Sequence, residues 1–261
     1  MVFVILTMIS ASLAAQEMSP RELRFACGKT QCSAYLLEPS QAGKYPAVLF
    51  LHWLGSPNGD KREFLPEGEQ LRKRGTVGLL VDMGWSDPAW FRARKVEGDF
   101  ETSMIEIEKI NAALDFLGSN EMVDKTRIAI VGHDFGGMFA MACLKERTKS
   151  PTAAFYVSVG STPRLSDWFF YNTKLSAEQE GEYMKRVGPL DPIRVARELH
   201  VPALFQFAKE DEFISKASAD QLFRAYAGPK ELDLQDGPHD LNSDSAVKAR
   251  VLWLKKKLQI E

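Results

Sequence analysis

A glycine-rich segment in the middle of the chain carries the residues best suited to chemistry. Residues 132–137 read Gly-His-Asp-Phe-Gly-Gly, directly after the apolar run Arg127–Val131 and before an apolar helical segment. A strand, a tight turn and a helix in this order present a nucleophile at the centre of the turn, where glycines let strand and helix approach. The central residue is Asp134. The segment predicts a carboxylate nucleophile, and the alternative is that Asp134 only caps the helix.

Two later loops supply an acid and a base. Asp211 follows one apolar strand-like run, and His239 lies in a Gly-Pro loop after another. A histidine oriented by an acid can deprotonate water. The chain order nucleophile, acid, histidine predicts a triad of Asp134, Asp211 and His239. The other acids that could orient the histidine are Glu210 and Asp236.

These residue types imply a mechanism. A carboxylate has a reference pKa of about 3.9, so Asp134 is ionised at neutral pH and needs no base to attack. Displacement at an electrophilic carbon would form a covalent ester, which water deprotonated by His239 would hydrolyse. Leu54 follows the apolar segment 46–52 closely and Phe135 follows the nucleophile, so their backbone N–H groups are the expected oxyanion hole.

The rest of the chain must position these groups. Runs that are apolar on successive residues predict strands covered on both faces, as in a parallel sheet. The predicted strands are Pro46–His52, Thr76–Asp82, Arg127–Val131, Ala153–Val159, Ala203–Phe207 and Glu231–Gln235. The predicted helices are about Asp99–Gly118, Ser215–Tyr226 and Ser243–Leu258. An antiparallel lead-in pair is expected at about Glu22–Ala26 and Ser33–Leu37.

Size and composition agree with one domain. The chain has 261 residues, of which 45% are hydrophobic and 26% charged, as is typical of soluble globular proteins. We expect a single α/β domain over residues 16–261, a mainly parallel sheet flanked by helices, with a short lid insertion at about residues 161–200. A formal net charge of −2 offers no basic face, so we expect no nucleic-acid partner.

The N-terminus and the cysteines indicate a compartment. Residues 1–15 are uncharged and mostly apolar, too short for a confident bilayer span, and predict a signal peptide. An N-terminal core strand is the alternative, and no stable membrane span is expected after removal of the leader. Cys27 and Cys32 flank a predicted tight turn, and a disulfide there would suit export. A secreted or periplasmic location is therefore expected, with the cytoplasm as the alternative.

From about Glu22 onward the chain resembles the α/β-hydrolases, closest in layout to the dienelactone hydrolase-like branch. Tyr45–His52 resembles that family's strand before the oxyanion loop. Asp134 departs from the cysteine of dienelactone hydrolases and from the serine of esterases. The segment 132–137 instead resembles haloalkane dehalogenases and epoxide hydrolases, which use an aspartate nucleophile. The resemblance implies the α/β-hydrolase fold and a hydrolase, and the motifs offer no metal or cofactor site.

The substrate is less defined by these residues. Haloalkane dehalogenases place a halide-binding tryptophan after the aspartate, and Phe135 has no such N–H, so dehalogenation is not favoured. Epoxide hydrolases use two cap tyrosines, for which Tyr171 and Tyr183 are candidates, although aromatic lid packing is the favoured role. Aromatic loops over a sheet indicate a small apolar or aromatic substrate. The predicted substrate-binding residues are Trp53, Trp85, Trp168 and Tyr171.

Three functional interpretations remain at this point. The first is a covalent-aspartate hydrolase of a small organic molecule. The second is an ester or lactone hydrolase of the dienelactone type, in which Asp134 attacks through an anhydride or activates water. The third is a catalytically inactive scaffold that binds a ligand. All three involve a small-molecule ligand, and the oligomeric state is left open.

Overall fold

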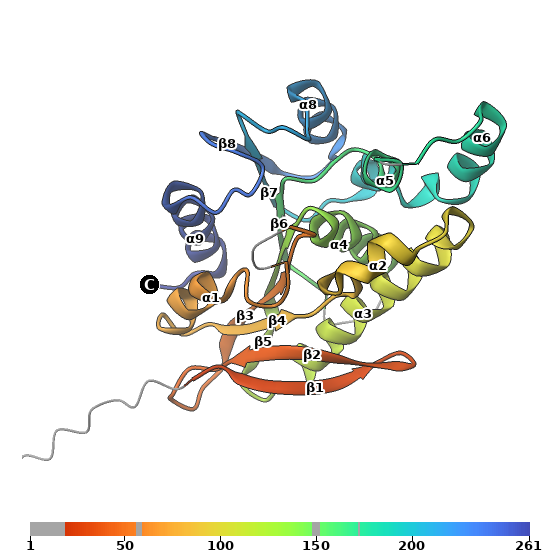
Figure 1. The fold of residues 1–261 in the computed structure, drawn as a ribbon. Helices are drawn as coiled ribbons and strands as arrows, with labels where there is room; N and C mark the ends of the chain where they lie inside the picture. Colours follow the sequence, from red (N-terminus) through yellow and green to blue (C-terminus); the bar gives the residue numbers. More distant parts are fainter. Residues whose placement is uncertain (1–18, 56–58, 148–151, 172) are drawn as a thin grey trace, which may run out of the picture.

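The computed structural model describes residues 19–55, 59–147, 152–171 and 173–261, which form one eight-stranded sheet covered by helices (Figure 1). The strand order is β1-β2-β4-β3-β5-β6-β7-β8. The pairs β1–β2 and β2–β4 are antiparallel and all later neighbours are parallel, which confirms the predicted mainly parallel sheet. The strands are β1 (Arg21–Cys27), β2 (Thr30–Leu37), β3 (Tyr45–Leu51), β4 (Val77–Val81), β5 (Val123–His133), β6 (Phe155–Val159), β7 (Ala203–Ala208) and β8 (Lys230–Gln235).

Helices cover both faces of this sheet. Their bounds are α1 (Leu65–Arg72), α2 (Pro88–Ala93), α3 (Asp99–Ser119), α4 (Phe135–Glu146), α5 (Leu165–Phe169), α6 (Ala177–Arg186), α7 (Pro192–Val195), α8 (Lys216–Ala225) and α9 (Asp244–Leu258). Single turns of 3₁₀ helix occur at Gly84–Ser86, Val96–Gly98, Gly188–Leu190 and Ala196–Glu198. The side chains of Ser215 and Ser243 cap α8 and α9, so the three predicted helices are confirmed within about two residues.

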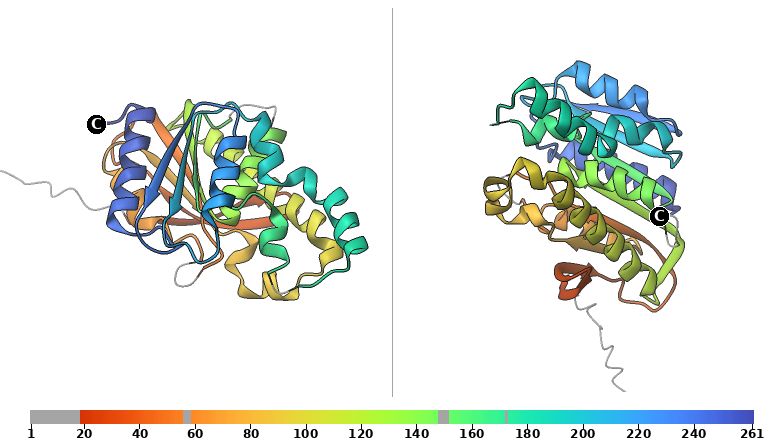
Figure 2. Two further views of the ribbon diagram at one scale, coloured as in Figure 1. Left: turned by 90° about the horizontal axis from the view of Figure 1, so that it is seen from above. Right: turned by 90° about the vertical axis from the view of Figure 1, so that its right-hand side faces the viewer.

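The central strand β3 explains the layering. Its side chains alternate between faces, so Ala47, Leu49 and Leu51 join one hydrophobic cluster while Val48 and Phe50 join another. The first cluster is covered by α3, α4 and α8, and the second by α1 and α9, on opposite sides of the sheet (Figure 2). Because β3 is apolar on both faces, it must lie in the middle of the sheet, and its carboxyl end lies at the same edge of the sheet as those of β5, β6 and β7.

The insertion between β6 and β7, predicted to form a short lid, approaches the strand ends with only one of its helices. It carries α5, α6 and α7, within the predicted range 161–200. The helix α6 projects beside α2 and the start of α3, and Arg186 forms an ion pair with Glu101 at 2.6 Å (Figure 1). The short helix α5 lies closer to the strand ends, and it is the part of the insertion that reaches the site described below.

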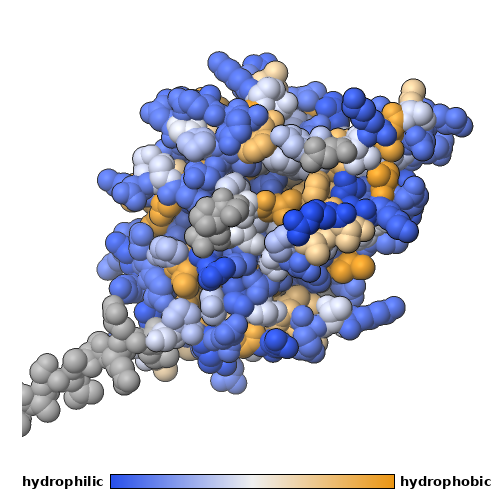
Figure 3. All heavy atoms as spheres, in the orientation of Figure 1, coloured by the Kyte–Doolittle hydropathy of each residue, from blue (hydrophilic) through white to orange (hydrophobic). Residues whose placement is uncertain are grey.

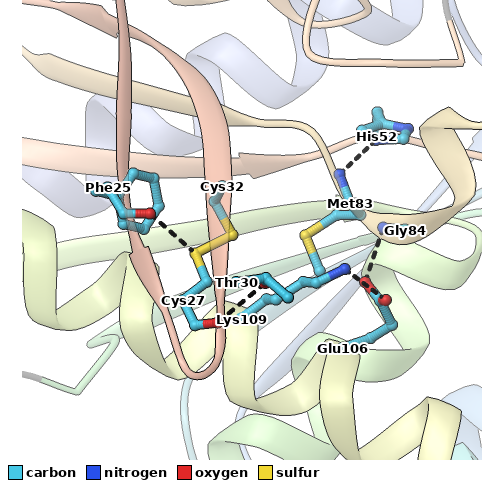
Figure 4. Close-up of a disulfide and its surroundings, with 9 residues drawn as sticks. All are labelled: Phe25, Cys27, Thr30, Cys32, His52, Met83, Gly84, Glu106 and Lys109. Atoms are coloured by element: carbon cyan, nitrogen blue, oxygen red, sulfur yellow. Dashed lines mark hydrogen bonds and ion pairs between the residues drawn. A yellow bond between two sulfur atoms is a disulfide. The ribbon is translucent and has the colours of Figure 1, made fainter.

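The β1–β2 hairpin carries the predicted disulfide. The sulfur atoms of Cys27 and Cys32 are bonded across the turn, as Figure 4 shows. The predicted signal peptide lies outside the described residues, so export stays a prediction. No helix in the described ranges is long and apolar enough to cross a membrane. In the view of Figure 3, apolar residues form small patches on a mostly hydrophilic surface.

Candidate active site

The turn between β5 and α4 is a strained strand-to-helix elbow. Asp134 has φ 52° and ψ −120°, a left-handed conformation that is unfavourable for a residue with a Cβ. Its backbone N–H donates to the carbonyl of Val159 on β6 at 2.9 Å. A Cβ on Gly132 would lie 2.5 Å from the backbone of Gly136, and one on Gly136 would lie 2.3 Å from the carbonyl oxygen of Leu51. Glycine at both positions is therefore required to form the elbow.

The two oxygens of the Asp134 carboxylate differ in their surroundings. Oδ2 accepts a hydrogen bond from the Leu54 N–H at 3.3 Å, and the Phe135 N–H also stabilises the carboxylate. Oδ1 is buried and has no hydrogen-bond partner among the described residues. One predicted oxyanion donor, the Leu54 N–H, thus bonds to Oδ2, while Oδ1 has no partner among the described residues.

His239 and Asp211 meet as predicted. The His239 Nδ1 atom lies 2.8 Å from Asp211 Oδ2, and both side chains are almost fully buried. The other oxygen of Asp211 accepts from the backbone N–H groups of Phe213 and Ile214, at 2.9 and 2.7 Å, which fixes the carboxylate. Since the carboxylate can only accept, Nδ1 carries the hydrogen, and within the described parts of the chain the buried Nε2 is free of partners.

The alternative acids point elsewhere. Glu210 accepts a hydrogen bond from the Gly237 N–H, and Asp236 forms an ion pair with Lys209 at 2.6 Å. Neither of these contacts involves the His239 ring. The structure therefore selects Asp211 as the acid that orients the histidine.

Burial and charge shift the titration of these groups. Burial raises the pKa of Asp134 to about 6, although nearby histidines and the two N–H donors favour the charged form. Burial lowers the pKa of His239, but its hydrogen bond to Asp211 and the charges of both aspartates outweigh this, so its pKa lies above the usual value. Burial also raises the pKa of Asp211, and its hydrogen bonds, that to His239 first, bring the pKa below its usual value.

The oxyanion loop is anchored from several sides. The His52 Nδ1–H donates to the carbonyl of Trp53 at 2.8 Å, and His52 Nε2 accepts from the Met83 N–H at 3.0 Å, as Figure 4 shows for the second bond. The indole N–H of Trp85 donates to the His52 carbonyl at 2.9 Å. These bonds hold the segment that carries the Leu54 N–H.

Aromatic rings surround His239. The ring centroids of Trp53, Trp168 and Phe213 lie 6.1, 5.6 and 5.3 Å from that of His239. Trp53 and Trp168 therefore lie at the site, as predicted. Tyr171 is 61% exposed and contacts Trp168 and Phe213, so it lies at the outer edge of this group.

Trp85 is placed differently from the prediction. Its side chain is 1% exposed and packs against Trp90, Phe135 and Phe139 in the core beneath the elbow. Trp85 supports the oxyanion loop instead of lining a substrate site. An aromatic residue in a loop can face inward or outward, and its sequence context does not distinguish the two. Tyr183, the other tyrosine candidate, is buried against Phe170.

Sequence reasoning missed Glu63. Its side chain is 1% exposed, and its two oxygens contact the His133 ring and the Trp53 N–H, at 2.5 and 2.8 Å. Glu63 stands in the polar run Asp60-Lys-Arg-Glu, which resembles an exposed turn, so no signal marked it as buried. Among the described residues, no group of three His, Cys, Asp or Glu side chains is placed to hold a metal ion.

Solved structures with the same fold support the architecture. A 2,6-dihydroxy-pseudo-oxynicotine hydrolase superposes with a TM-score of 0.70 at 18% identity, covering 92% of this chain and 68% of that one. An esterase from Thermogutta terrifontis superposes with a TM-score of 0.66 at 17% identity, and the superposition covers 91% of this chain and 92% of the esterase. At these identities the likeness shows the fold, which is that of α/β-hydrolases.

Sequence comparisons define the family. A probable 2-oxo-3-(5-oxofuran-2-ylidene)propanoate lactonase from Bradyrhizobium sp. is 28% identical over 206 residues, which are 77% of this chain and 74% of the relative. The family model described as the dienelactone hydrolase family matches residues 32–234. This match runs from β2 to β8, includes Asp134 and Asp211, and ends just before the loop that carries His239. The elbow, the acid loop and the sheet that joins them thus fall within one family match, and the chain belongs to the dienelactone hydrolase family of α/β-hydrolases.

Proposed function

We propose that this hydrolase acts on a small organic substrate through a covalent ester of Asp134, with His239 as the base and Asp211 as its orienting acid. One observation carries the proposal. Oδ2 of Asp134 already accepts the hydrogen bond from the Leu54 N–H, whereas Oδ1 has no hydrogen-bond partner among the described residues. A carboxylate held in this way can attack with one oxygen while the other stays in the oxyanion hole.

In the first step, Oδ1 attacks an electrophilic carbon of the substrate. A C–O bond forms to Asp134, and the bond from that carbon to the leaving group breaks, with its electron pair departing on the leaving group. The result is a neutral ester whose carbonyl oxygen is Oδ2. No proton has to leave Asp134, because the attacking form is the carboxylate.

In the second step, water hydrolyses this ester. His239 Nε2 has no hydrogen and no partner in the described ranges, so it can take a proton from water as the oxygen attacks Cγ of Asp134. Negative charge then develops on Oδ2, which already accepts the Leu54 N–H, and the Phe135 N–H also stabilises the carboxyl group. Collapse releases the alkoxide, which takes the proton held by His239 and leaves as the alcohol. The carboxylic acid that remains on Asp134 keeps the second hydrogen of the water and loses it to solvent as a proton, which regenerates the carboxylate.

Ester or lactone hydrolysis is the second candidate. It is supported by the family match and by the lactonase name of the Bradyrhizobium relative. In that reaction the substrate's carbonyl oxygen needs the oxyanion donors, so Oδ2 of Asp134 would have to vacate them first. This competition favours the covalent-ester route. An inactive scaffold, in turn, would have no use for a histidine held by an acid beside a free carboxylate oxygen.

A substrate screen tests the proposal. Wild-type protein and the Asp134→Ala variant are incubated with pools of alkyl halides, epoxides, esters and lactones, and products are detected by mass spectrometry. We expect the wild type to turn over one pool and Asp134→Ala to match buffer alone. The control is Asp236→Ala, which alters an exposed acid and should retain activity. Turnover that survives in Asp134→Ala would rule out the covalent route.

A further inference from the structure

Glu63 connects segments that the mechanism needs in register. It lies between the oxyanion loop and α1, and its Oε2 accepts the backbone N–H of Trp53, the neighbour of Leu54, at 2.8 Å. Its Oε1 lies 2.5 Å from Nδ1 of His133, the neighbour of Asp134. One buried carboxyl group therefore bridges the oxyanion loop and the elbow.

His133 extends this bridge to the third loop. Its Nε2 lies 3.3 Å from the backbone carbonyl of His239. Its ring stacks on Trp53 with centroids 5.0 Å apart and planes 6° apart, which shields the pair from water. The chain of contacts runs from Trp53 through Glu63 and His133 to His239. Trp53 is next to Leu54 of the oxyanion loop, His133 is next to Asp134, and His239 is the proposed base.

The hydrogens in this chain can be counted. The His239 carbonyl only accepts, so His133 Nε2 must carry a hydrogen, and one further proton must lie between Glu63 Oε1 and His133 Nδ1. Without that proton, a carboxylate would face the bare lone pair of Nδ1 at 2.5 Å. If the imidazole hydrogen moved to Nδ1 instead, bare Nε2 would face the His239 carbonyl. Loss of the shared proton therefore breaks one of the two links.

The surroundings of Glu63 and His133 keep both side chains uncharged near neutral pH. Burial raises the pKa of Glu63 to about 8 and lowers that of His133 to about 3, which places the shared proton on Glu63. The charged group of α9 that faces Glu63 is Arg250, but Arg250 is ion-paired with Glu67 of α1 at 3.1 Å. His52 of the oxyanion loop also faces Glu63, and burial lowers its pKa, so it adds no positive charge near neutral pH. A hydrogen bond with the Asn242 side chain lowers the pKa of Glu63, but burial has the larger effect.

We propose that Glu63 is a positioning residue of this hydrolase, and that the proton it shares with His133 keeps the oxyanion loop, the elbow and the His239 loop in register. The proposal rests on the proposed function in that these three segments carry the chemistry. It predicts that the Glu63→Gln variant preserves the arrangement, because the amide can donate to Nδ1 and accept from Trp53 with no proton to lose.

Nitrogen NMR of histidine tests this inference without a substrate. The chain has four histidines, and the His200→Asn variant identifies the signal of the exposed one. In ¹⁵N-histidine-labelled wild type, we expect His133 Nδ1 to change with a midpoint near pH 8, and the His239 ring signals to show the same midpoint besides their own titration. In Glu63→Gln, both changes should disappear from that range.

Two results would overturn the inference. One is a wild-type titration in which the His133 signals show no alkaline transition. This result does not depend on whether the Glu63→Gln variant folds. The other is a transition that persists unchanged in folded Glu63→Gln. Because the readout involves neither a substrate nor an ester on Asp134, it can fail while the covalent route succeeds, and the reverse.

Discussion

At the residue scale, the site combines a strained backbone with an unevenly bonded carboxylate. A non-glycine residue in the left-handed region costs on the order of 1–3 kcal/mol, so the φ of 52° at Asp134 must be enforced by its neighbours. The same burial that enforces it removes water from the carboxylate and raises its pKa to about 6. A less solvated carboxylate is also a stronger nucleophile, so we expect burial to favour attack by Asp134.

The pKa shifts predict an acid limb in the pH profile. Asp134 must be ionised to attack, so the active fraction falls as pH falls through about 6. His239 must be neutral to accept a proton in the second step, so its raised pKa lowers kcat in the same direction. We expect kcat/KM, which reports the first step, to decline by about tenfold per pH unit on the acid side. The measurement is kcat/KM against pH, and a profile flat through pH 6 would contradict the assignment of Asp134.

Asp211→Asn should impair catalysis without impairing folding. The backbone donors Phe213 and Ile214 require the amide oxygen on their side, so the amide nitrogen would face His239 Nδ1 and force the hydrogen onto Nε2. His239 could then no longer act as a base, and kcat should fall by about 10⁴-fold. Steady-state kinetics and a thermal melt measure the two effects. The matched control is Glu210→Gln, and an equal loss in that variant would contradict the role of Asp211.

The chemistry of single residues was largely predictable from sequence, and their supports were not. Asp134, Asp211 and His239 follow strand ends, a local signal that places all three at the same edge of a parallel sheet. Glu63 carries no such signal, because its burial arises from contacts with β5 and the oxyanion loop. Trp85 was predicted to bind substrate but lies in the core, because only packing decides whether an aromatic residue in a loop faces the core.

At the scale of elements, the elbow depends on close approach between β3, β5 and α4. Gly136→Ala would bring a Cβ to 2.3 Å from the Leu51 carbonyl, and backbone cannot move aside as a side chain can. We expect a loss of about 1–3 kcal/mol in the free energy of unfolding, measured by urea denaturation. Gly181→Ala in α6 is the control.

Gly181 lies in the interior of α6, and a Cβ added there would meet no atom of the described residues within 4 Å. Replacing it with alanine should raise the free energy of unfolding by about 0.5–1 kcal/mol, because glycine is the poorer helix former. Destabilisation by both substitutions, or by neither, would show that close packing at the elbow is not what demands glycine.

The sequence predicted the existence of elements better than their limits. β5 begins at Val123, four residues before the apolar run, because Tyr45 pairs with Val123 across an irregularity in the β3–β5 ladder. The intervening residues Asp124–Thr126 are polar and gave no strand signal. The arrangement within the insertion also depends on tertiary contacts, because α6 lies beside α3, where Arg186 pairs with Glu101, while α5 lies at the site.

At the scale of the whole molecule, the hairpin β1–β2 closes the sheet edge, and its disulfide should add stability. The bond joins residues five apart, and a loop this short should contribute about 2 kcal/mol by restricting the unfolded chain. We expect the double variant Cys27→Ala, Cys32→Ala to unfold at lower urea concentration than the oxidised wild type. Identical midpoints for oxidised and reduced wild-type protein would contradict this prediction.

The family match and the aspartate at the elbow together raise the question of which reaction Asp134 performs. The chain has the fold of a dienelactone hydrolase family member, and its elbow presents a carboxylate whose Oδ2 accepts the Leu54 N–H, one of the donors predicted for an oxyanion hole. A family architecture is compatible with several chemistries, so the residues at the site must decide between them. For this reason we propose attack by Asp134 on the carbon that bears the leaving group, with formation of a covalent ester, and the following test decides whether it occurs.

The most direct test is the mass of the peptide that contains Asp134 after the His239→Gln variant has met its substrate. Without the base, ester formation can proceed but its hydrolysis is slowed, so the intermediate should accumulate. We expect a mass increase on Asp134 equal to the substrate without its leaving group, less the one hydrogen of the carboxylic acid that it replaces. An unmodified Asp134 peptide, from a variant that releases the leaving group in the same incubation, would contradict the covalent mechanism.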